Sequence, residues 1–173
     1  MRRFNLIVTH LPGPEGKRRA IWTLKQLLPD LSIVDSKPNI LLCTVEDPLK
    51  AVEVLRSSLP PKTTILRVIP VLDVRSVKVS DVKSSVENLI AKTEGGSFAI
   101  RLDGHLEDER GRLMSRRESI EIIASGIDRR VNLRNPDVLV YIKVVKLGRR
   151  WVAAIYVGKP SNIISTVKHY VSS

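Results

Sequence analysis

The sequence contains little of the chemistry on which most enzyme active sites depend. Its 173 residues include one cysteine, three histidines and only 4% aromatic residues. A single cysteine excludes a disulfide framework and a cysteine-based zinc site, and it is typical of a reducing compartment. The histidines, His10, His105 and His169, are scattered along the chain and form no pair with metal-ligand spacing.

Nucleotide-binding and catalytic motifs are also missing. The sequence has no Gly-x4-Gly-Lys-Ser/Thr loop, no Gly-x-Gly-x-x-Gly after a strand and no recognisable nucleophile–base pair. His105 with Asp103, Glu107 and Asp108 could be drawn as a metal cluster, but a solvated polar loop explains the same residues. We therefore expect no enzymatic activity, no bound metal and no cofactor.

Long apolar runs are absent. No window approaches 18 uncharged apolar residues, and no apolar h-region follows Met1-Arg2-Arg3, so the sequence predicts neither a membrane span nor a signal peptide. Cys43 lies inside the apolar run 40–45 and is expected to be a reduced core residue. These features together predict a cytoplasmic protein.

Positive charge is what the chain has in excess. The formal net charge is +11, from 29 Lys and Arg against 18 Asp and Glu. Residues 1–73 hold 11 basic and 7 acidic residues, and residues 74–173 hold 18 and 11, so both parts are basic. A surface rich in Lys and Arg also occurs in thermophiles. The excess nevertheless points to a polyanionic partner, with nucleic acid as the first candidate.

The first part of the chain shows alternating strand and helix patterns. Apolar periodicity with Pro and Gly breaks predicts strands at 4–9, 31–35, 40–45 and 64–72, and helices at 15–28 and 49–59. The order βαββαβ is that of a ferredoxin-like fold, which we assign to residues 1–75. Such a fold implies no function by itself.

Three cations, Lys17, Arg18 and Arg19, fall in the first turn of the first predicted helix. A helix start favours anions, so these cations could serve a ligand, although a solvated charge run explains them equally well. His10, beside the same loop, could also contact a ligand, and we interpret it as a surface residue.

The second part, residues 76–173, predicts another α/β domain. A helix at 81–92 with Ser80 as its cap is followed by a strand at 97–102 and by a helix that begins after Ser115. Strands at 138–146 and 151–157 form a hairpin, and 162–171 forms a short helix or an edge strand. The expected fold class is therefore α+β, with two α/β sandwich-type domains.

The stretch Ser115–Asn135 is the most informative part of this domain. Ser115 and Glu118 form a capping box, so a helix begins here. Arg116 and Arg117 then lie in the first turn, where the helix dipole disfavours each cation by about 0.3–1 kcal/mol. Because helix-start amides favour anions, two guanidinium groups beside them would make a phosphate site. The alternative is two solvated surface arginines.

Further cations accompany this helix start in the second domain. Together they form the predicted RNA-binding set: Arg101, Arg112, Arg116, Arg117, Lys143, Lys146, Arg149 and Arg150. Trp22 and Trp151 are expected to pack inside the protein, which argues against a surface built on base stacking. The composition favours contacts to phosphate and sugar of a folded RNA, which position more than they specify.

Several segments of this domain resemble a THUMP domain. They are the strand S-F-A-I-R at 97–101, the helix 115–126, and V-N-L-R-N-P-D at 131–137 before a hydrophobic hairpin. The likeness covers about residues 76–158. A ferredoxin-like domain ahead of THUMP is usual in 4-thiouridine synthetases and in THUMP-bearing tRNA methyltransferases. The resemblance implies tRNA binding, with the two modules gripping the acceptor-stem region.

Only about fifteen residues follow the THUMP-like part, so we expect no attached catalytic domain. In this respect the chain is similar to stand-alone THUMP proteins that act as tRNA-binding adaptors for cytidine acetylation. Such adaptors often carry a basic run after the Arg101 strand, whereas this chain has the acidic segment L-D-G-H-L-E-D-E-R-G-R. If the strand end binds phosphate, the loop must turn its acids away.

The resulting hypothesis is a non-catalytic tRNA-binding protein that presents tRNA to a modifying, acetyltransferase-like enzyme. Two alternatives stay open. One is a basic protein-interaction or scaffold domain that binds an acidic protein, and the other is a small enzyme with an unrecognised site.

Overall fold

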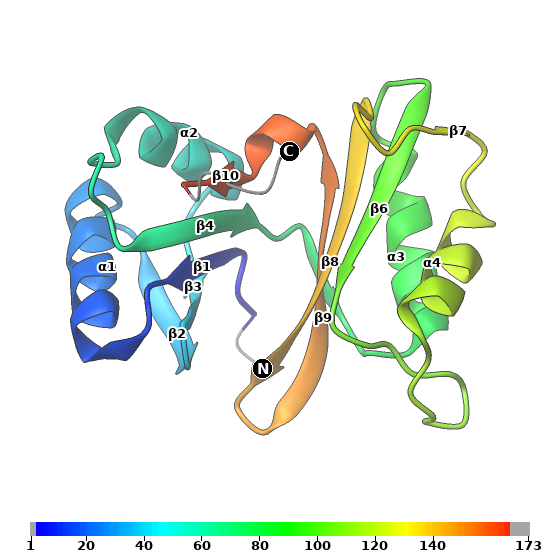
Figure 1. The fold of residues 1–173 in the computed structure, drawn as a ribbon, viewed down its shortest axis with the longest axis horizontal. Coiled ribbons are helices and arrows are strands. Elements are labelled where there is room, and N and C mark those ends of the chain that lie inside the picture. The colour runs from blue at the N-terminus through cyan, green and yellow to red at the C-terminus, as the bar shows by residue number, and fades with distance from the viewer. Residues whose placement is uncertain (1–2, 167–173) are drawn as a thin grey trace. The chain divides into compact units, whose positions relative to one another are not determined.

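The computed structural model describes residues 3–166, which form two compact units (Figure 1). The first unit extends to Val71 and includes the segment from Ser161 onward, and the second is Leu72–Pro160. The sequence pattern placed everything after residue 75 in one domain. That assignment is wrong for residues 161–166, because β10 (Ile164–Ser165) pairs with β4 (Ile65–Pro70). By pairing there, β10 covers backbone groups that β4 would otherwise leave open at the sheet edge.

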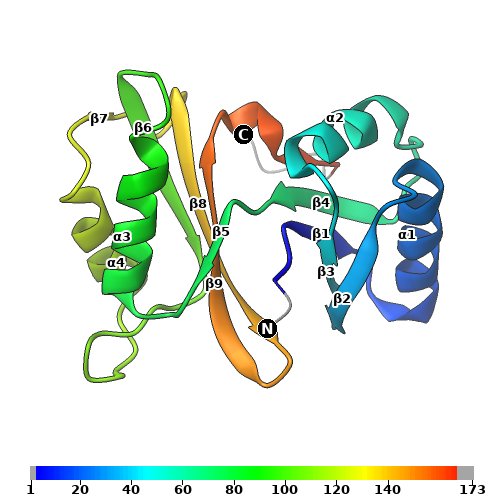
Figure 2. The same ribbon diagram turned by 180° about the vertical axis from the view of Figure 1, so that it is seen from behind.

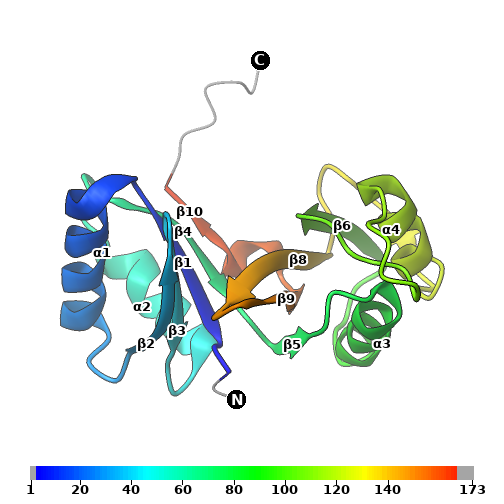
Figure 3. The same ribbon diagram turned by 90° about the horizontal axis from the view of Figure 1, so that it is seen from below.

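The first unit is a ferredoxin-like sandwich, as predicted. Its elements are β1 (Leu6–His10), α1 (Gly13–Leu27), β2 (Ser32–Lys37), β3 (Ile40–Thr44), α2 (Pro48–Ser58) and β4. The antiparallel sheet has the order β10-β4-β1-β3-β2. Both helices pack on one face of this sheet (Figure 3). The predicted inward residues of α2, which are Ala51, Val52 and Leu55, are buried.

The second unit is also a sheet with two helices on one face (Figure 2). Its elements are β5 (Asp73–Arg75), α3 (Val79–Ile90), β6 (Ser97–Asp103), α4 (Arg116–Ala124), β7 (Arg130–Val131), β8 (Val138–Leu147) and β9 (Arg150–Gly158). The strand order is β5-β9-β8-β6-β7, and β6 runs parallel to β7 and β8. The apolar even-numbered side chains of β8 face the helices, as the alternation predicted. A short 3-10 turn, Pro160–Asn162, follows β9. The mixed α/β class of both units agrees with the expected fold class.

The start of α3 differs from the prediction. The helix begins at Val79 with Lys78 as its N-cap, so Ser80 lies inside the first turn and is not the cap. Its hydroxyl donates instead to the carboxylate of Glu109. A serine near a helix start satisfies whichever acceptor tertiary structure brings to it, and local sequence does not reveal that acceptor.

The segment V-N-L-R-N-P-D holds the parallel strands in register. The carboxylate of Asp137 accepts from the amides of Gly96 and Ser97, at 2.9 and 3.2 Å, while the Ser97 hydroxyl accepts from the Asp137 amide at 3.0 Å. Gly95 is required because a Cβ there would lie 2.6 Å from the Cβ of Asp137. These bonds tie the start of β8 to the start of β6, so both strands end at the same edge of the sheet.

Within residues 3–166, no helix combines the length and the apolar composition needed to cross a membrane. His169 and the predicted element beyond residue 166 lie outside the described residues.

Candidate nucleic-acid interface

All eight predicted RNA-binding residues lie in the second unit, and six gather at one edge of its sheet. Because β6 and β8 are parallel, their carboxyl ends meet there. The loop 104–115 and the start of α4 follow β6, and the β8–β9 hairpin tip follows β8, so these segments lie at the same end of the unit (Figure 1). We call these six residues the cationic edge: Arg112, Arg116, Arg117, Lys146, Arg149 and Arg150.

The start of α4 is capped as the sequence predicted. The Ser115 hydroxyl accepts from the Glu118 amide at 3.1 Å. Arg117 pairs with Glu121 at 3.1 Å, but both side chains are mostly exposed, so the pair is weak. Arg116 is exposed and has no acidic partner in the described part of the chain. Since Ser115 already occupies one amide, the attraction of this helix start for phosphate comes mainly from the arginines.

The hairpin tip contributes cations and an aromatic ring. Gly148 closes the turn with a φ of 61°. Arg149 precedes β9, Arg150 is its first residue, and both are exposed. The ammonium of Lys146 stands 5.9 Å from the centroid of the Trp151 ring, a cation–π arrangement. Trp151 itself is 56% exposed, so the prediction that it packs inside the protein is wrong. It is the second residue of β9 and pairs with Lys146 of β8, next to the hairpin turn.

The other tryptophan is exposed as well. Trp22 is 66% exposed on the solvent side of α1, where the buried positions are Gly16, Ala20 and Leu24. The argument against base stacking therefore loses its basis, because both indole rings are available at the surface. Trp151 is the residue that the sequence interpretation missed at the cationic edge. Its position directly after Arg149-Arg150 was the available signal.

An apolar pocket of about 350 Å³ lies beside Trp151. Gly104, with a φ of 107°, lets the chain pass close over β8, since a Cβ there would lie 2.7 Å from the Cβ of Val144. The exposed indole ring of Trp151 thus forms part of the pocket wall. Its lining residues are Val77, Gly104, His105, Glu107, Leu113, Val144 and Trp151.

Arg101 and Lys143 are placed differently from the cationic edge. Both approach the carboxylate of Asp103, at 3.7 and 3.6 Å, and the Tyr141 hydroxyl donates to the same carboxylate. The Arg101 guanidinium also lies 5.1 Å from the centroid of the Tyr141 ring. The Lys143 side chain is only 17% exposed. The charge of Asp103 therefore offsets much of the charge that these two residues would offer to a phosphate.

The acidic loop 104–115 engages two of its three acids in hydrogen bonds, Asp108 within the loop and Glu109 with α3. Asp108 accepts from the amides of Arg110 and Arg112, at 2.8 and 3.0 Å, and so stabilises its own turn. Glu109 accepts from Ser80 on α3. Buried Leu106 and Met114 anchor the loop, and their backbones bond at 2.8 Å. Across residues 3–166, no group of three His, Cys, Asp or Glu side chains is arranged to hold a metal ion.

Two titratable groups with shifted pKa values lie outside the cationic edge, Cys43 buried in β3 and Asp73 half-buried in β5. Burial raises the pKa of the Cys43 thiol in β3 to about 12, and nearby Lys25 only partly opposes this. Burial also tends to raise the pKa of Asp73, but hydrogen bonds from Ser85 and Arg75, the charge of Arg75 and the Val74 amide together lower it. Both groups therefore act on stability.

No family model and no curated protein sequence matches the chain. Solved structures do share its fold. A 4-thiouridine synthetase in complex with RNA and bound ATP aligns with a TM-score of 0.55 and 12% identity, over 91% of this chain and 42% of that one. PH1313 from Pyrococcus horikoshii Ot3 aligns with a TM-score of 0.53 and 13% identity, over 90% and 55%.

TrmN from Thermus thermophilus aligns with a TM-score of 0.50 and 16% identity, over 88% of this chain and 44% of that one. The alignments extend over both units of the chain, which spans about half the length of these solved structures. The THUMP resemblance described above names 4-thiouridine synthetases among the proteins in which a ferredoxin-like domain precedes THUMP. The chain therefore shares a fold with these proteins, in the order that the resemblance predicted.

Proposed function

We propose that this protein binds tRNA through the cationic edge and presents it to a modifying enzyme, without catalysing the modification itself. The observation that carries the proposal is the gathering of six cations at one end of one unit. Four of them, Arg112, Arg116, Arg149 and Arg150, are exposed and have no acidic side-chain partner among residues 3–166. Clustered, unpaired arginines are what a phosphate backbone requires of a protein surface.

The fold and the sequence resemblance support the proposal that the ligand is tRNA. The chain resembles a THUMP-domain protein in sequence pattern, and its fold is shared with a 4-thiouridine synthetase that was solved in complex with RNA. The net charge of +11 would attract any polyanion. In the loop 104–115, two of the acids are engaged in local bonds, Asp108 with the amides of Arg110 and Arg112, and Glu109 with Ser80.

The contacts would be of two kinds. The arginines of the α4 start and of the hairpin tip would hold phosphates and so position the RNA without reading its sequence. Trp151, exposed beside Lys146, offers a flat ring on which an unpaired base can stack. A folded RNA with a short unpaired segment fits this combination better than a regular duplex.

Salt dependence tests the electrostatic part of the proposal. If about six phosphates are neutralised, tRNA affinity should fall on the order of 10³-fold between 50 and 200 mM salt. A filter-binding titration of purified tRNA over this range measures the slope. Affinity that does not change with salt, or the absence of binding, would rule out the cationic edge as an RNA site.

A charge reversal locates the site. Losing two phosphate contacts weakens binding about 30-fold at 0.15 M salt, so we expect this loss for Arg116→Glu with Arg117→Glu. The matched control reverses Arg130, in β7, and Arg134, just after it, which are both exposed. β7 pairs with the start of β6, whereas the cationic edge lies where β6 ends. A clearly smaller loss in the control supports the cationic edge, whereas equal losses would point to non-specific attraction.

We propose separately that the protein acts as an adaptor for cytidine acetylation, with an acetyltransferase-like enzyme as its partner. Deleting the coding sequence should remove acetylated cytidine from cellular tRNA, which mass spectrometry of tRNA nucleosides measures. Unchanged acetylcytidine would exclude this modification while leaving RNA binding intact. A protein complex that survives nuclease treatment and requires no tRNA would favour the scaffold alternative.

A further inference from the structure

The start of α1, in the first unit, borders a second polar pocket. The pocket has a volume of about 290 Å³. One wall is the end of β1 and the first turn of α1, and the other is the β2–β3 turn. The lining residues are His10, Gly13, Pro14, Lys17, Ser36, Lys37, Pro38 and Asn39. No part of the cationic edge belongs to this unit.

His10 is the unusual residue of this pocket. It is only 2% exposed, so the interpretation of His10 as a surface residue is wrong. Its Nδ1 lies 2.8 Å from the Leu11 carbonyl oxygen, and since a carbonyl can only accept, Nδ1 carries a proton. The other ring nitrogen, Nε2, is buried and has no hydrogen-bond partner among the described residues. Buried polar atoms are almost always bonded, so Nε2 points to a partner that is not part of the protein.

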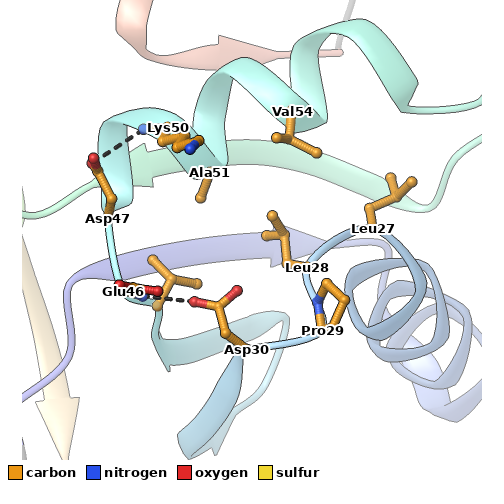
Figure 4. A pocket seen from close by; sticks show the side chains of 10 residues that line it. Leu27, Leu28, Pro29, Asp30, Glu46, Asp47, Lys50, Ala51 and Val54 are labelled. Carbon is orange, nitrogen blue, oxygen red and sulfur yellow. Dashed lines mark hydrogen bonds between the residues drawn. The ribbon is translucent and has the colours of Figure 1, made fainter.

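The amides at the start of α1 also lack a side-chain partner. The N-cap residue is Pro12, which has no polar side chain and makes no capping bond. The other helix of this unit shows the usual arrangement: Asp47 caps α2 by accepting from the amides of Leu49 and Lys50, at 3.1 and 3.2 Å (Figure 4). The start of α1 thus keeps the attraction for an anion that the carboxylate satisfies at α2.

Charges near the pocket favour the same class of ligand. Lys17, the fifth residue of α1, lines the pocket and has no acidic partner in residues 3–166. Glu15 is the acid of this turn, but it is paired with Arg18 and Arg19 and does not line the pocket. Gly13, with a φ of 91°, leads the chain into the helix and leaves open space beside it.

We propose that this pocket binds a phosphate group. The Gly13, Glu15 and Gly16 amides at the start of α1 and the Lys17 ammonium would hold its oxygens. His10 Nε2 would donate to one of these oxygens, with a proton that solvent supplies as the anion binds. That bond would complete the hydrogen bonding of the imidazole ring. Because Nε2 has almost no exposed surface, the contact requires a small shift of the β2–β3 turn, whose Pro38 and Asn39 are exposed.

The site stands independently of RNA binding at the cationic edge. The phosphate could come from an RNA backbone or from a free phosphate compound, and both offer the same oxygens to the pocket. The two sources are separated by titrating the full chain with inorganic phosphate in one arm and with tRNA in the other.

Nuclear magnetic resonance of the full chain, followed at the His10 ring nitrogens and at the backbone amides, tests the proposal. Inorganic phosphate, added against a background of constant ionic strength set by chloride, should shift the His10 Nε2 signal in a saturable way. The same curve should be followed by the backbone amides of Gly13, Glu15, Gly16, Lys17, Ser36, Lys37 and Asn39. The exposed His105 in the other unit is the internal control and should not follow the same curve.

Lys17→Ala should weaken phosphate binding about tenfold, and Lys50→Ala, on the capped helix α2, should leave it unchanged. Lys17 is the fifth residue of α1 and Lys50 is the third residue of α2, so both lie near the start of a helix in the same unit. No saturable shift at His10, or equal effects of the two variants, would overturn the site. His10 shifts that tRNA also produces, and that survive in Arg116→Glu with Arg117→Glu, would assign the phosphate to RNA. Shifts with inorganic phosphate alone would assign it to a free phosphate compound.

Discussion

The starts of α1 and α4 look alike in sequence and differ in physics. Each carries adjacent cations in or near its first turn, Lys17-Arg18-Arg19 in one and Arg116-Arg117 in the other. At α4 the amide end is capped by Ser115 and the foremost arginine is unpaired. At α1 the amide end has no cap, and two of the three cations are bound to Glu15. One start therefore offers side-chain charge, and the other offers backbone amides.

This difference shows why cations at a helix start are an ambiguous signal. An anion can be attracted by guanidinium groups that project from the helix, or by amides that nothing else occupies. The first kind of site suits a long phosphate backbone running across a surface. The second suits a single phosphate held in a pocket. What separates them is the identity of the capping residue and the partner of each charge.

The largest test of the comparison reverses charge at the cationic edge. Replacing Arg116, Arg117, Arg149 and Arg150 by Glu removes four phosphate contacts, which corresponds to about 10³-fold weaker tRNA binding at 0.15 M salt. Reversing Arg18 and Arg19, whose charges are already engaged by Glu15, should cost much less. Filter binding measures both. A loss from the α1 pair that equals the loss from the edge would remove the distinction between the two starts.

The second test compares the two exposed tryptophans, one in each unit. Stacking of a base on an aromatic ring contributes about 1–3 kcal/mol, so Trp151→Ala should weaken tRNA binding at least about fivefold. Trp22→Ala, on the solvent side of α1, should not. Fluorescence provides a direct readout, because tRNA should quench Trp151 in the Trp22→Phe variant. If quenching persists only when Trp22 is present, the stacking surface belongs to the first unit.

Much of the fold could be predicted because its elements are encoded locally. The apolar periodicity of α2 and the alternation along β8 specify buried faces within a few residues of sequence. The Ser115 cap is equally local, since the hydroxyl and the Glu118 amide are three residues apart. The ferredoxin-like order and the basic second unit followed from these patterns.

The rest depended on partners that are distant in sequence. Arg101 and Lys143 share Asp103 only because parallel pairing places residue 103 opposite residue 143. Ser80 is not the cap because α3 begins at Val79, and its hydroxyl bonds instead to Glu109 of a distant loop. His10 is buried because it ends a strand inside the unit, and its unpaired nitrogen is visible only in three dimensions. Sequence shows where charges are, whereas the structure shows which of them are already satisfied.

A smaller effect is expected from the cap itself. Ser115→Ala removes the bond to the Glu118 amide and should lower the stability of the second unit by about 1 kcal/mol. Ser80→Ala is the matched control, since that serine starts a neighbouring helix without capping it, and its effect should stay within about 0.5 kcal/mol. Denaturant unfolding followed by Trp151 fluorescence measures the difference. Equal losses would show that Ser115 contributes as an ordinary surface polar group.

The acid response provides a stability reporter for the second unit. Although burial opposes it, hydrogen bonds from Ser85 and Arg75 hold the pKa of Asp73 below the ordinary 3.8. The unfolded chain therefore takes up the proton first, and the stability from Asp73 is full above pH 3.8 and lost as pH falls below it. Asp73→Asn should lower the free energy of unfolding at pH 7. It should also make the free energy of unfolding depend less on pH between pH 5 and 2. If the loss of stability in acid is the same in the variant, other carboxylates cause that loss.

The smallest effect concerns Cys43, and it supplies the matching reporter for the first unit. Burial raises the pKa of this thiol from 9.0 to about 12, so the unfolded chain loses the proton first as pH rises. The contribution is full below pH 9 and is lost between pH 9 and 12, and at pH 9 the loss is only about 0.4 kcal/mol. In Cys43→Ala the free energy of unfolding should therefore depend less on pH in the alkaline range. Unfolding at fixed pH values from 8 to 10 measures this. A variant at the start of α1 that leaves the free energy of unfolding unchanged at every pH, and that still binds phosphate more weakly, has changed ligand binding and not the stability of its unit. If the alkaline loss of stability is the same in Cys43→Ala, the thiol does not cause it. The comparison of the two helix starts would then need a probe elsewhere in β3.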